Sequence, residues 1–414
     1  MIETTTLSNG LRLVTEEMDG VRSACLGFWV GTGSRDEAPE QAGISHFLEH
    51  LLFKGTPGRS ARSIAEAIDA VGGDMNAFTT KEYTTFYVRT LAEDLSLGVE
   101  ILTDIMRDPA LRPDEVDAER QVILEEVLMH LDEPSDVVQE RFTEAMFPGH
   151  PLGREVLGLP EVITAVSVDD IRSFFEHHYR PGNIVVAAAG ALDRPYLVDA
   201  LEAAFDGGSP GGPPAREAPP GSVRRLDVTT RDSEQAHLVV GVRGPARRAP
   251  ERFALSLLNH TLGGGISSRL FQTIREERGL AYSIVSDRIA FADAGALAVS
   301  VGTAPEHSRQ VLDLVLAELD ALAAEGVTKA ELDVAKGSLR ADTLLGLEDS
   351  GSRMSRIGAS LLLHGEVLEA DEILTRIEAV TRDEIAGIAG QLLAGERVLA
   401  AVGPFDEGEL GELV

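Results

Sequence analysis

The sequence predicts an α+β protein built from two similar halves, each with an antiparallel-rich sheet that packs helices on one face. Residues 84–89 alternate apolar and polar side chains, as strands of antiparallel sheets do. The apolar run at 24–30 has a counterpart at 236–242, which indicates an internal duplication. A stretch rich in Gly and Pro at 207–221 separates the copies, because it can form neither a helix nor a central strand.

The first half is expected to run strand, helix, helix, strands, two or more helices and a final strand. The run at 24–30 predicts a buried strand, and residues 183–190 predict the final one. Between them, apolar side chains at helical spacing predict a half-buried helix that ends near Gly55 and Pro57. Its apolar positions are Ile44, Phe47, Leu48, Leu51 and Leu52. A second amphipathic helix is expected to begin near Ser60 and to lead into strands.

The second half repeats this order. Residues 256–265 align with residues 46–55, and residues from Ser268 onward align with those from Ser60 onward. Residues 397–403 repeat the final apolar strand. Each half is long enough to bury its own core, so two domains are expected. Their boundaries are 1–206 for the first domain, 207–222 for the linker and 223–414 for the second domain.

The composition narrows the classes of partner. The net charge of −31 argues against nucleic acid, because phosphate binding needs a basic surface. The excess acid is expected to be solvated surface, and an acidic chamber that selects basic peptides is the alternative. No apolar run of about 18 residues occurs and no secretory signal is visible, so no membrane partner is expected. The single cysteine, Cys25, excludes an internal disulfide. Together these features favour the cytoplasm of a prokaryote.

The most informative motif is H-x-x-E-H, formed by His46, Glu49 and His50. Positions four residues apart lie on one helix face, so the two imidazoles can hold one zinc ion. Glu49 lies beside them and can act on a zinc-bound water. The order matches the inverzincin signature, the inverse of H-E-x-x-H. Chance would produce this motif in roughly a few per cent of such chains, which leaves incidental histidines as the alternative.

A catalytic zinc site needs a third protein ligand. The best candidate region is the acidic stretch at 115–130, which follows the helix-start residues Pro113 and Asp114. Glu119 and Glu126 are seven residues apart and share one helix face. We therefore favour Glu126 as the third ligand and Glu119 as a carboxylate that orients a ligand. An acidic helix face exposed to water is the alternative.

Together these residues resemble the pitrilysin/insulinase family of zinc peptidases, which includes the mitochondrial processing peptidase. The resemblance covers nearly the whole chain. The stretches that carry it, besides the H-x-x-E-H motif, are residues 7–12, 72–79, 119–126, 150–153, 179–183, 268–271 and 275–283. So many motifs in one order are highly specific. The resemblance implies a family fold of two similar α+β halves that face each other as a clam-shell.

The resemblance also implies roles for individual residues. The zinc ligands would be His46, His50 and Glu126, with one ion per chain. Glu49 would be the general base, and Glu119 would support catalysis. The implied activity is that of a zinc-dependent endopeptidase that cleaves unfolded peptides inside a closed chamber.

Four further residues are implied to contact the peptide. Asn76 and Ala77 would lie on an edge strand that pairs with the substrate backbone. Arg275 and Tyr282 would reach the substrate carbonyl from the second half of the chain, although a core position for Tyr282 is the alternative. Because the zinc motif and the Arg/Tyr pair occur on one chain, a homodimer is favoured.

Two alternatives are open, and only the first belongs to another functional class. The chain could be a non-catalytic structural or assembly subunit of the same family, or the catalytic half of a heterodimeric peptidase. The duplication shows how zinc chemistry can be lost, because the second copy places Ser256, Asn259 and His260 opposite the residues of the motif. The natural substrate and the cleavage-site preference have no signal in the sequence.

Overall fold

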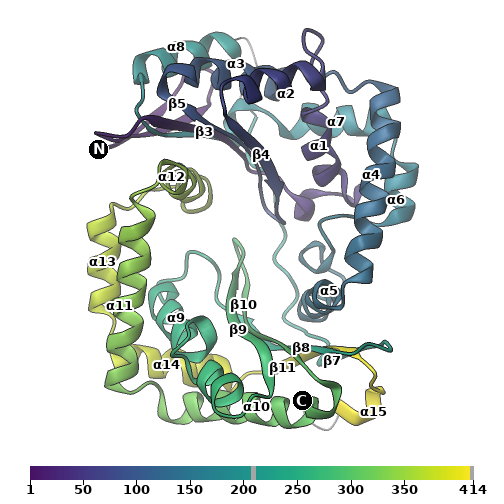
Figure 1. Ribbon diagram of the computed structural model, residues 1–414, viewed down its shortest axis with the longest axis vertical. Coiled ribbons are helices and arrows are strands. Elements are labelled where there is room, and N and C mark those ends of the chain that lie inside the picture. Colours follow the sequence, from purple (N-terminus) through teal and green to yellow (C-terminus); the bar gives the residue numbers. More distant parts are fainter. Residues whose placement is uncertain (207–210, 411–414) are drawn as a thin grey trace. The chain divides into compact units, whose positions relative to one another are not determined.

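The computed structural model of the chain describes residues 1–206 and 211–410, which form two compact units (Figure 1). The segments of unit 1 are Met1–Leu128, Arg154–Arg216 and Leu344–Glu369. The segments of unit 2 are Met129–Gly153, Glu217–Thr343 and Ala370–Val414. The chain passes into unit 2 after Arg216, inside the expected linker, whose residues 207–210 lie outside the described residues. Each unit also takes one segment from the other half of the sequence, so the division into domains at 207–222 stays a proposal.

Unit 1 contains a six-stranded sheet in the order β1-β2-β6-β3-β5-β4. Its strands are β1 (Ile2–Thr6), β2 (Arg12–Glu17), β3 (Ser23–Val30), β4 (Asp74–Thr79), β5 (Thr84–Leu91) and β6 (Ile184–Gly190). Neighbouring strands are antiparallel except β2 and β6, which are parallel. β4 ends the sheet, so its outer edge has no partner strand among residues 1–206 and 211–410.

Most helices and short helical turns from the first half of the sequence belong to unit 1. They are η1 (Ser34–Asp36), η2 (Pro39–Gln41), α1 (Ile44–Leu52), α2 (Ala61–Ala70), η3 (Ala92–Asp94), α3 (Leu95–Arg107), α4 (Pro113–Asp132), α6 (Pro160–Ala165), α7 (Val168–His178), η5 (Pro181–Asn183) and α8 (Arg194–Ala204). α4 continues past Leu128, where unit 1 ends in this part of the chain. The main helices of this half pack on one sheet face and share one core, as the sequence predicted.

The opposite face of this sheet is covered by a helix from the second half of the sequence. Side chains alternate along β3, so Phe28 joins the main core while Trp29 points to the other face. There α12 (Ser350–His364) packs on β3 and β6 (Figure 1). Its apolar side chains share a core with Trp29. Gly358 of α12 permits the close approach, because a Cβ at that position would lie 2.6 Å from the Trp29 ring. The sequence did not predict this crossing of a helix into the first unit.

Unit 2 repeats the topology with a five-stranded sheet in the order β7-β11-β8-β10-β9. Its strands are β7 (Leu226–Thr230), β8 (Ala236–Gly244), β9 (Ala281–Ala290), β10 (Gly295–Thr303) and β11 (Arg397–Gly403). The parallel pair of β7 and β11 corresponds to that of β2 and β6, and the other neighbours are antiparallel. The structure thus confirms the mixed helix and sheet fold with two similar halves.

The helices of unit 2 follow the same scheme. They are α5 (Pro134–Met146), η4 (Pro151–Gly153), α9 (Arg252–Asn259), η6 (His260–Gly264), η7 (Phe271–Glu276), η8 (Pro305–His307), α10 (Ser308–Glu325), α11 (Lys329–Gly346), α13 (Ala370–Ala379), α14 (Arg382–Leu393) and α15 (Glu407–Leu410). The elements η6 and η7 are π-helical, so the amphipathic helix expected from Ser268 onward is in fact a short π-helical segment. α5, from the first half of the sequence, covers one face of this sheet, while α9, α10 and α14 pack on the other.

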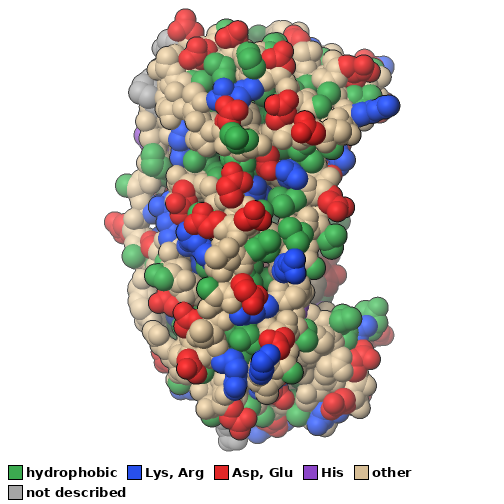
Figure 2. Space-filling view, turned by 90° about the vertical axis from the view of Figure 1, so that its left-hand side faces the viewer, with side chains coloured by type: hydrophobic (Ala, Val, Ile, Leu, Met, Phe, Trp, Pro, Cys, Tyr) green, Lys and Arg blue, Asp and Glu red, His purple; other side chains and the backbone are tan. Residues whose placement is uncertain are grey.

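The surface distributes its charge without one large patch of a single sign on the face shown in Figure 2. There acidic, basic and hydrophobic side chains are interspersed. This distribution favours solvated acidic surface on that face. In residues 1–206 and 211–410, every helix is too short or too polar to cross a lipid bilayer.

Candidate metal centre

Helix α1 carries the H-x-x-E-H motif on the border between core and solvent. Phe47 and Leu51 are buried in the main core of unit 1, which fixes the rotation of the helix about its axis. His46 is 6% exposed, and His50 lies one turn further along on the same face. The helix begins after Gly43, whose φ of +97° suits glycine. A helix of nine residues therefore presents both imidazoles toward α4.

The two imidazoles and Glu126 form a group that fits a metal ion. Glu126 Oε2 lies 3.7 Å from His46 Nε2 and 3.5 Å from His50 Nε2. The ligand atoms of the three residues all lie within 4.8 Å of one another. A tetrahedral zinc ion with bonds of about 2.0–2.1 Å separates its ligand atoms by about 3.3–3.4 Å. Two nitrogens and one carboxylate oxygen are also the donors of a catalytic zinc site. Among the described residues, no other group of three such side chains meets this closely.

Glu119 orients one of these ligands. Its Oε1 lies 2.8 Å from His50 Nδ1, and its Oε2 lies 2.5 Å from Lys54 Nζ. If Nδ1 of His50 carries the ring proton and donates it in a hydrogen bond to Glu119, the Nε2 lone pair is left free on the side of Glu126. Lys54 was missed in the sequence, because it lies in the turn after α1 and only its position four residues after His50 gave a signal.

The register of α4 agrees with the choice of Glu126. Glu119 is buried and Glu126 half-buried, whereas the neighbouring Glu125 is exposed. Adjacent residues of an α-helix point about 100° apart, so Glu125 cannot share the face of Glu126. The alternative for this helix was an acidic face exposed to water. The burial of Glu119 shows that the acidic stretch is not uniformly exposed.

Burial sets the protonation states in the centre. Desolvation, with a smaller contribution from His50, lowers the pKa of His46 to about 4, so its imidazole is neutral as a metal ligand must be. Desolvation also raises the pKa of Glu49, although a hydrogen bond with Thr79 lowers it. The Oε2 atom of Glu49 is buried and has no hydrogen-bond partner among the described residues. A carboxylate oxygen of raised pKa thus lies next to the metal-binding group, ready to accept a proton.

Asn76 and Ala77 lie on β4, the edge strand expected from the sequence. Helix α1 packs beside this strand, and Thr79 Oγ1 lies 3.5 Å from the carbonyl oxygen of Ser45. Asn76 Oδ1 accepts the Ala77 backbone N–H at 2.8 Å. The unpaired strand edge and the metal-binding residues therefore belong to the same unit.

Arg275 and Tyr282 lie in unit 2, close to each other. The guanidinium carbon of Arg275 lies 5.2 Å from the centre of the Tyr282 ring and 4.6 Å from that of Phe271. Tyr282 is 83% exposed, so the alternative of a core position for it is wrong. The metal-binding residues lie in unit 1, so a common site for both groups stays a prediction.

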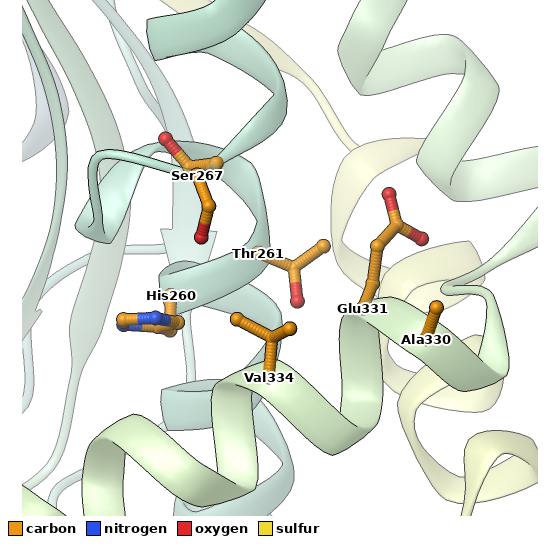
Figure 3. Close-up of a pocket in the computed structure, with 7 residues that line it drawn as sticks. His260, Thr261, Ser267, Ala330, Glu331 and Val334 are labelled. Atoms are coloured by element: carbon orange, nitrogen blue, oxygen red, sulfur yellow. The ribbon is translucent and has the colours of Figure 1, made fainter.

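His260, the second-copy counterpart of His50, has a different environment. It lines a cavity of about 170 Å³ with hydroxyl and apolar side chains (Figure 3). Glu331 also lines the cavity, but its two oxygens accept hydrogen bonds from Arg269 at 2.6 and 2.9 Å. Among the described residues, His260 is not part of a close group of three potential metal ligands, and the loss of zinc chemistry in the second copy stays a prediction.

Comparison with known proteins identifies the class. The model of the insulinase family (peptidase family M16) matches residues 12–159, and the model described as the M16 inactive domain matches residues 165–339. The chain belongs to the M16 peptidase family.

Two bacterial relatives align over almost the whole chain. An uncharacterized zinc protease of Streptomyces coelicolor is 44% identical over 100% of this chain and 92% of its own length. An uncharacterized zinc protease of Bacillus subtilis is 36% identical over 98% of each chain.

Solved structures share the fold. A protease from Helicobacter pylori matches with a TM-score of 0.89 at 24% identity, over 98% of this chain and 99% of the other. A Pseudomonas fluorescens structure described as a peptidase M16 inactive domain matches with a TM-score of 0.90 at 21% identity, over 98% of both chains.

Proposed function

We propose that this protein is a zinc-dependent endopeptidase with one zinc ion per chain. The observation that carries the proposal is the group of His46, His50 and Glu126, whose spacing suits a tetrahedral ion, with Glu49 beside it. The names of the relatives, which are called zinc proteases, support it. A bound zinc ion would supply Lewis acidity and a water of lowered pKa.

Each of the other candidate residues would then have its own role in catalysis. Glu49 would take the proton from the attacking water, because its Oε2 is buried, unpartnered and of raised basicity. Glu119 would hold the His50 imidazole in the tautomer that keeps Nε2 unprotonated. Arg275 and Tyr282 would donate to the substrate carbonyl oxygen or position the peptide, which requires the two units to close around it as a chamber.

The edge of β4 would select the form of the substrate. Its unpaired backbone near Asn76 and Ala77 can add one extended strand by main-chain hydrogen bonds. Only an unfolded segment offers a free strand, so unfolded peptides are the proposed substrates. The Asn76 side chain would have to release the Ala77 N–H, which it now binds at 2.8 Å.

The cellular setting is also a proposal. A homodimer is favoured because the zinc motif and the Arg/Tyr pair lie on one chain. The cytoplasm of a prokaryote agrees with the bacterial relatives and with a single, buried, free cysteine, Cys25.

A peptide-library digest tests the proposed activity. The purified protein is incubated with the library with and without a chelator, the products are identified by mass spectrometry, and zinc is counted by elemental analysis. Cleavage that disappears with the chelator and returns with added zinc is expected, at one zinc per chain. A zinc-loaded protein that cleaves no peptide would instead support the non-catalytic assembly subunit, unless a partner chain restores cleavage.

A Tyr282→Phe variant tests the contribution of unit 2. We expect unchanged zinc content and melting temperature, and a kcat/KM lower by roughly 10–10³-fold, as for the loss of one positioning or oxyanion donor. Tyr196→Phe is a matched control, since Tyr196 is a half-exposed tyrosine on α8. Equal activity of the two variants would remove Tyr282 from the active site.

A further inference from the structure

The start of the metal-binding helix is held by a carboxylate that lies outside it. Glu37 Oε2 accepts the backbone N–H of Gly43 at 2.8 Å, and its Oε1 accepts that of Ser45 at 2.8 Å. Gly43, the residue before α1, has no side chain with which to cap the helix, so Glu37 supplies the acceptors from six residues upstream. A negative charge at this end is also favourable toward the helix dipole.

The surroundings of Glu37 leave its carboxylate few partners other than the start of α1. The residue is 5% exposed, so its two oxygens have little access to water. Burial raises the pKa of its carboxyl to about 7, whereas the two N–H donors and nearby Arg154 lower it. Both oxygens accept from the backbone, which is the arrangement of a carboxylate. The second donor, Ser45, directly precedes the ligand His46, so the position of Glu37 bears on the position of that imidazole.

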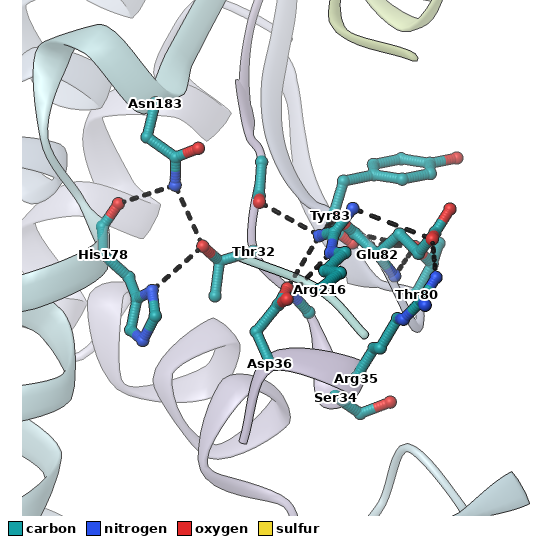
Figure 4. Close-up of polar contacts among 12 residues, drawn as sticks. Thr32, Ser34, Arg35, Asp36, Thr80, Glu82, Tyr83, His178, Asn183 and Arg216 are labelled. Atoms are coloured by element: carbon teal, nitrogen blue, oxygen red, sulfur yellow. Dashed lines mark hydrogen bonds and ion pairs between the residues drawn. The ribbon is translucent and has the colours of Figure 1, made fainter. Parts of the chain in front are cut away.

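The loop that carries Glu37 is anchored by buried charges (Figure 4). Asp36, the preceding residue, receives Arg216 Nε on its Oδ1 at 2.8 Å and Arg216 Nη2 on its Oδ2 at 2.7 Å. The same Nη2 donates to the carbonyl oxygens of Gly31 and Glu82 at 3.1 and 2.7 Å. Glu82 also accepts from Arg35 at 2.7 Å, and both of these side chains are almost completely buried. Such bidentate, charge-assisted contacts hold geometry well.

Arg216 comes from an unexpected part of the sequence. It is the last residue of unit 1 before the chain enters unit 2, within the Gly/Pro-rich stretch expected to be a linker. That stretch is therefore fastened to unit 1 at Arg216, next to the residue that caps α1. The polar run at 33–37 supplies the acceptor of this anchor, Asp36.

We propose that Glu37 and Arg216 are positioning residues for the metal centre. Glu37 fixes the start of α1, and Arg216 fixes the loop that presents Glu37, so that the imidazoles of His46 and His50 meet Glu126. This inference rests on the proposed zinc site. The contact of Arg216 with Asp36 would then help to hold the metal ligands in place before the ion binds. Neither Glu37 nor Arg216 would touch the metal or the substrate.

A Glu37→Gln variant separates positioning from general stability. A glutamine has one acceptor oxygen for two N–H donors, and its amide NH₂ opposes the second donor. We expect the zinc dissociation constant to rise by about 10–100-fold, as for the loss of a group that orients metal ligands. Glu40→Gln is the control, because Glu40 is an exposed glutamate of the neighbouring turn and the charge change is the same.

Two measurements are made on each variant: the zinc dissociation constant of the folded protein and the melting temperature of the zinc-free protein. A purely structural role would lower the melting temperature and leave the zinc affinity of the folded protein unchanged, which would overturn the proposal. If Glu37→Gln does not fold, Arg216→Lys decides, since lysine keeps the charge but loses the bidentate contact with Asp36.

For Arg216→Lys, zinc affinity weaker than in the wild type is expected, with Arg225→Gln, an exposed arginine further along the chain, as control. An unchanged zinc affinity in Arg216→Lys would show that Arg216 has no positioning role.

The wild type is measured first. A wild type that binds no zinc refutes the proposed function itself, whereas a zinc-binding, active wild type with unaffected variants refutes only the positioning role.

Discussion

A Glu49→Gln variant is expected to keep its zinc and to lose peptide hydrolysis by about 10²–10⁴-fold, the usual contribution of a general base. The proposed ligands are His46, His50 and Glu126, which would leave Glu49 free for proton transfer. Its Oε2 is buried without a hydrogen-bond partner in residues 1–206 and 211–410, and desolvation raises the pKa of the carboxyl, which makes the carboxylate a stronger base. Glutamine has nearly the same shape but cannot accept the proton.

The test needs zinc content and kcat/KM from the same preparation. Glu66→Gln on α2 serves as a control, because Glu66 is an exposed glutamate paired with Arg62. A zinc-loaded Glu49→Gln protein that still cleaves peptides at the wild-type rate would show that another group is the base. A loss of zinc together with activity would place Glu49 among the ligands instead.

A Glu126→Gln variant is expected to bind zinc more than about 100-fold more weakly, beyond the usual loss for a residue that only orients a ligand. Glu126 Oε2 faces the Nε2 atoms of both histidines at 3.5 and 3.7 Å. Replacing the carboxylate with a neutral amide removes a charged ligand from a dicationic site and leaves the two imidazoles without the third ligand.

Glu125→Gln is the matched control for this prediction. The two glutamates are adjacent and carry the same charge, but Glu125 is exposed and points about 100° away around the helix. Zinc affinity is measured by competition with a chromogenic chelator. Normal zinc binding in Glu126→Gln with loss in Glu125→Gln would mean that the register of α4 is wrong by one residue.

Local spacing in the sequence was sufficient to nominate the candidate metal ligands, whose binding of zinc stays a prediction. His46 and His50 share a helix face because they are four residues apart, and Glu119 and Glu126 share one because they are seven apart. The apolar run that forms β3 could likewise be read from a few neighbouring residues, whereas the edge strand at Asn76 and Ala77 was expected only from the family resemblance. These features depend on the periodicity of the backbone, which any stretch of sequence displays by itself.

Contacts between distant segments were decided only by the tertiary structure. An apolar helix face predicts burial, but hydrophobic attraction has no direction, so the sequence could not say that α12 covers the sheet of unit 1 or that α5 covers that of unit 2. Arg275 and Tyr282 were expected to act with the metal centre. The structure brings them next to each other, and their part in catalysis stays a prediction.

The polar partners of the metal centre show the same division. The sequence by itself nominated the side chains that could bind zinc, because ligand chemistry and helical spacing are local properties. Only the tertiary structure showed which contacts hold these side chains in place. Lys54 pairs with Glu119, Glu37 accepts hydrogen bonds from the start of α1, and Arg216 binds Asp36. The last of these contacts joins residues 180 positions apart. The reason is physical, since a hydrogen bond depends on the approach of two atoms within about 3 Å and not on their separation along the chain.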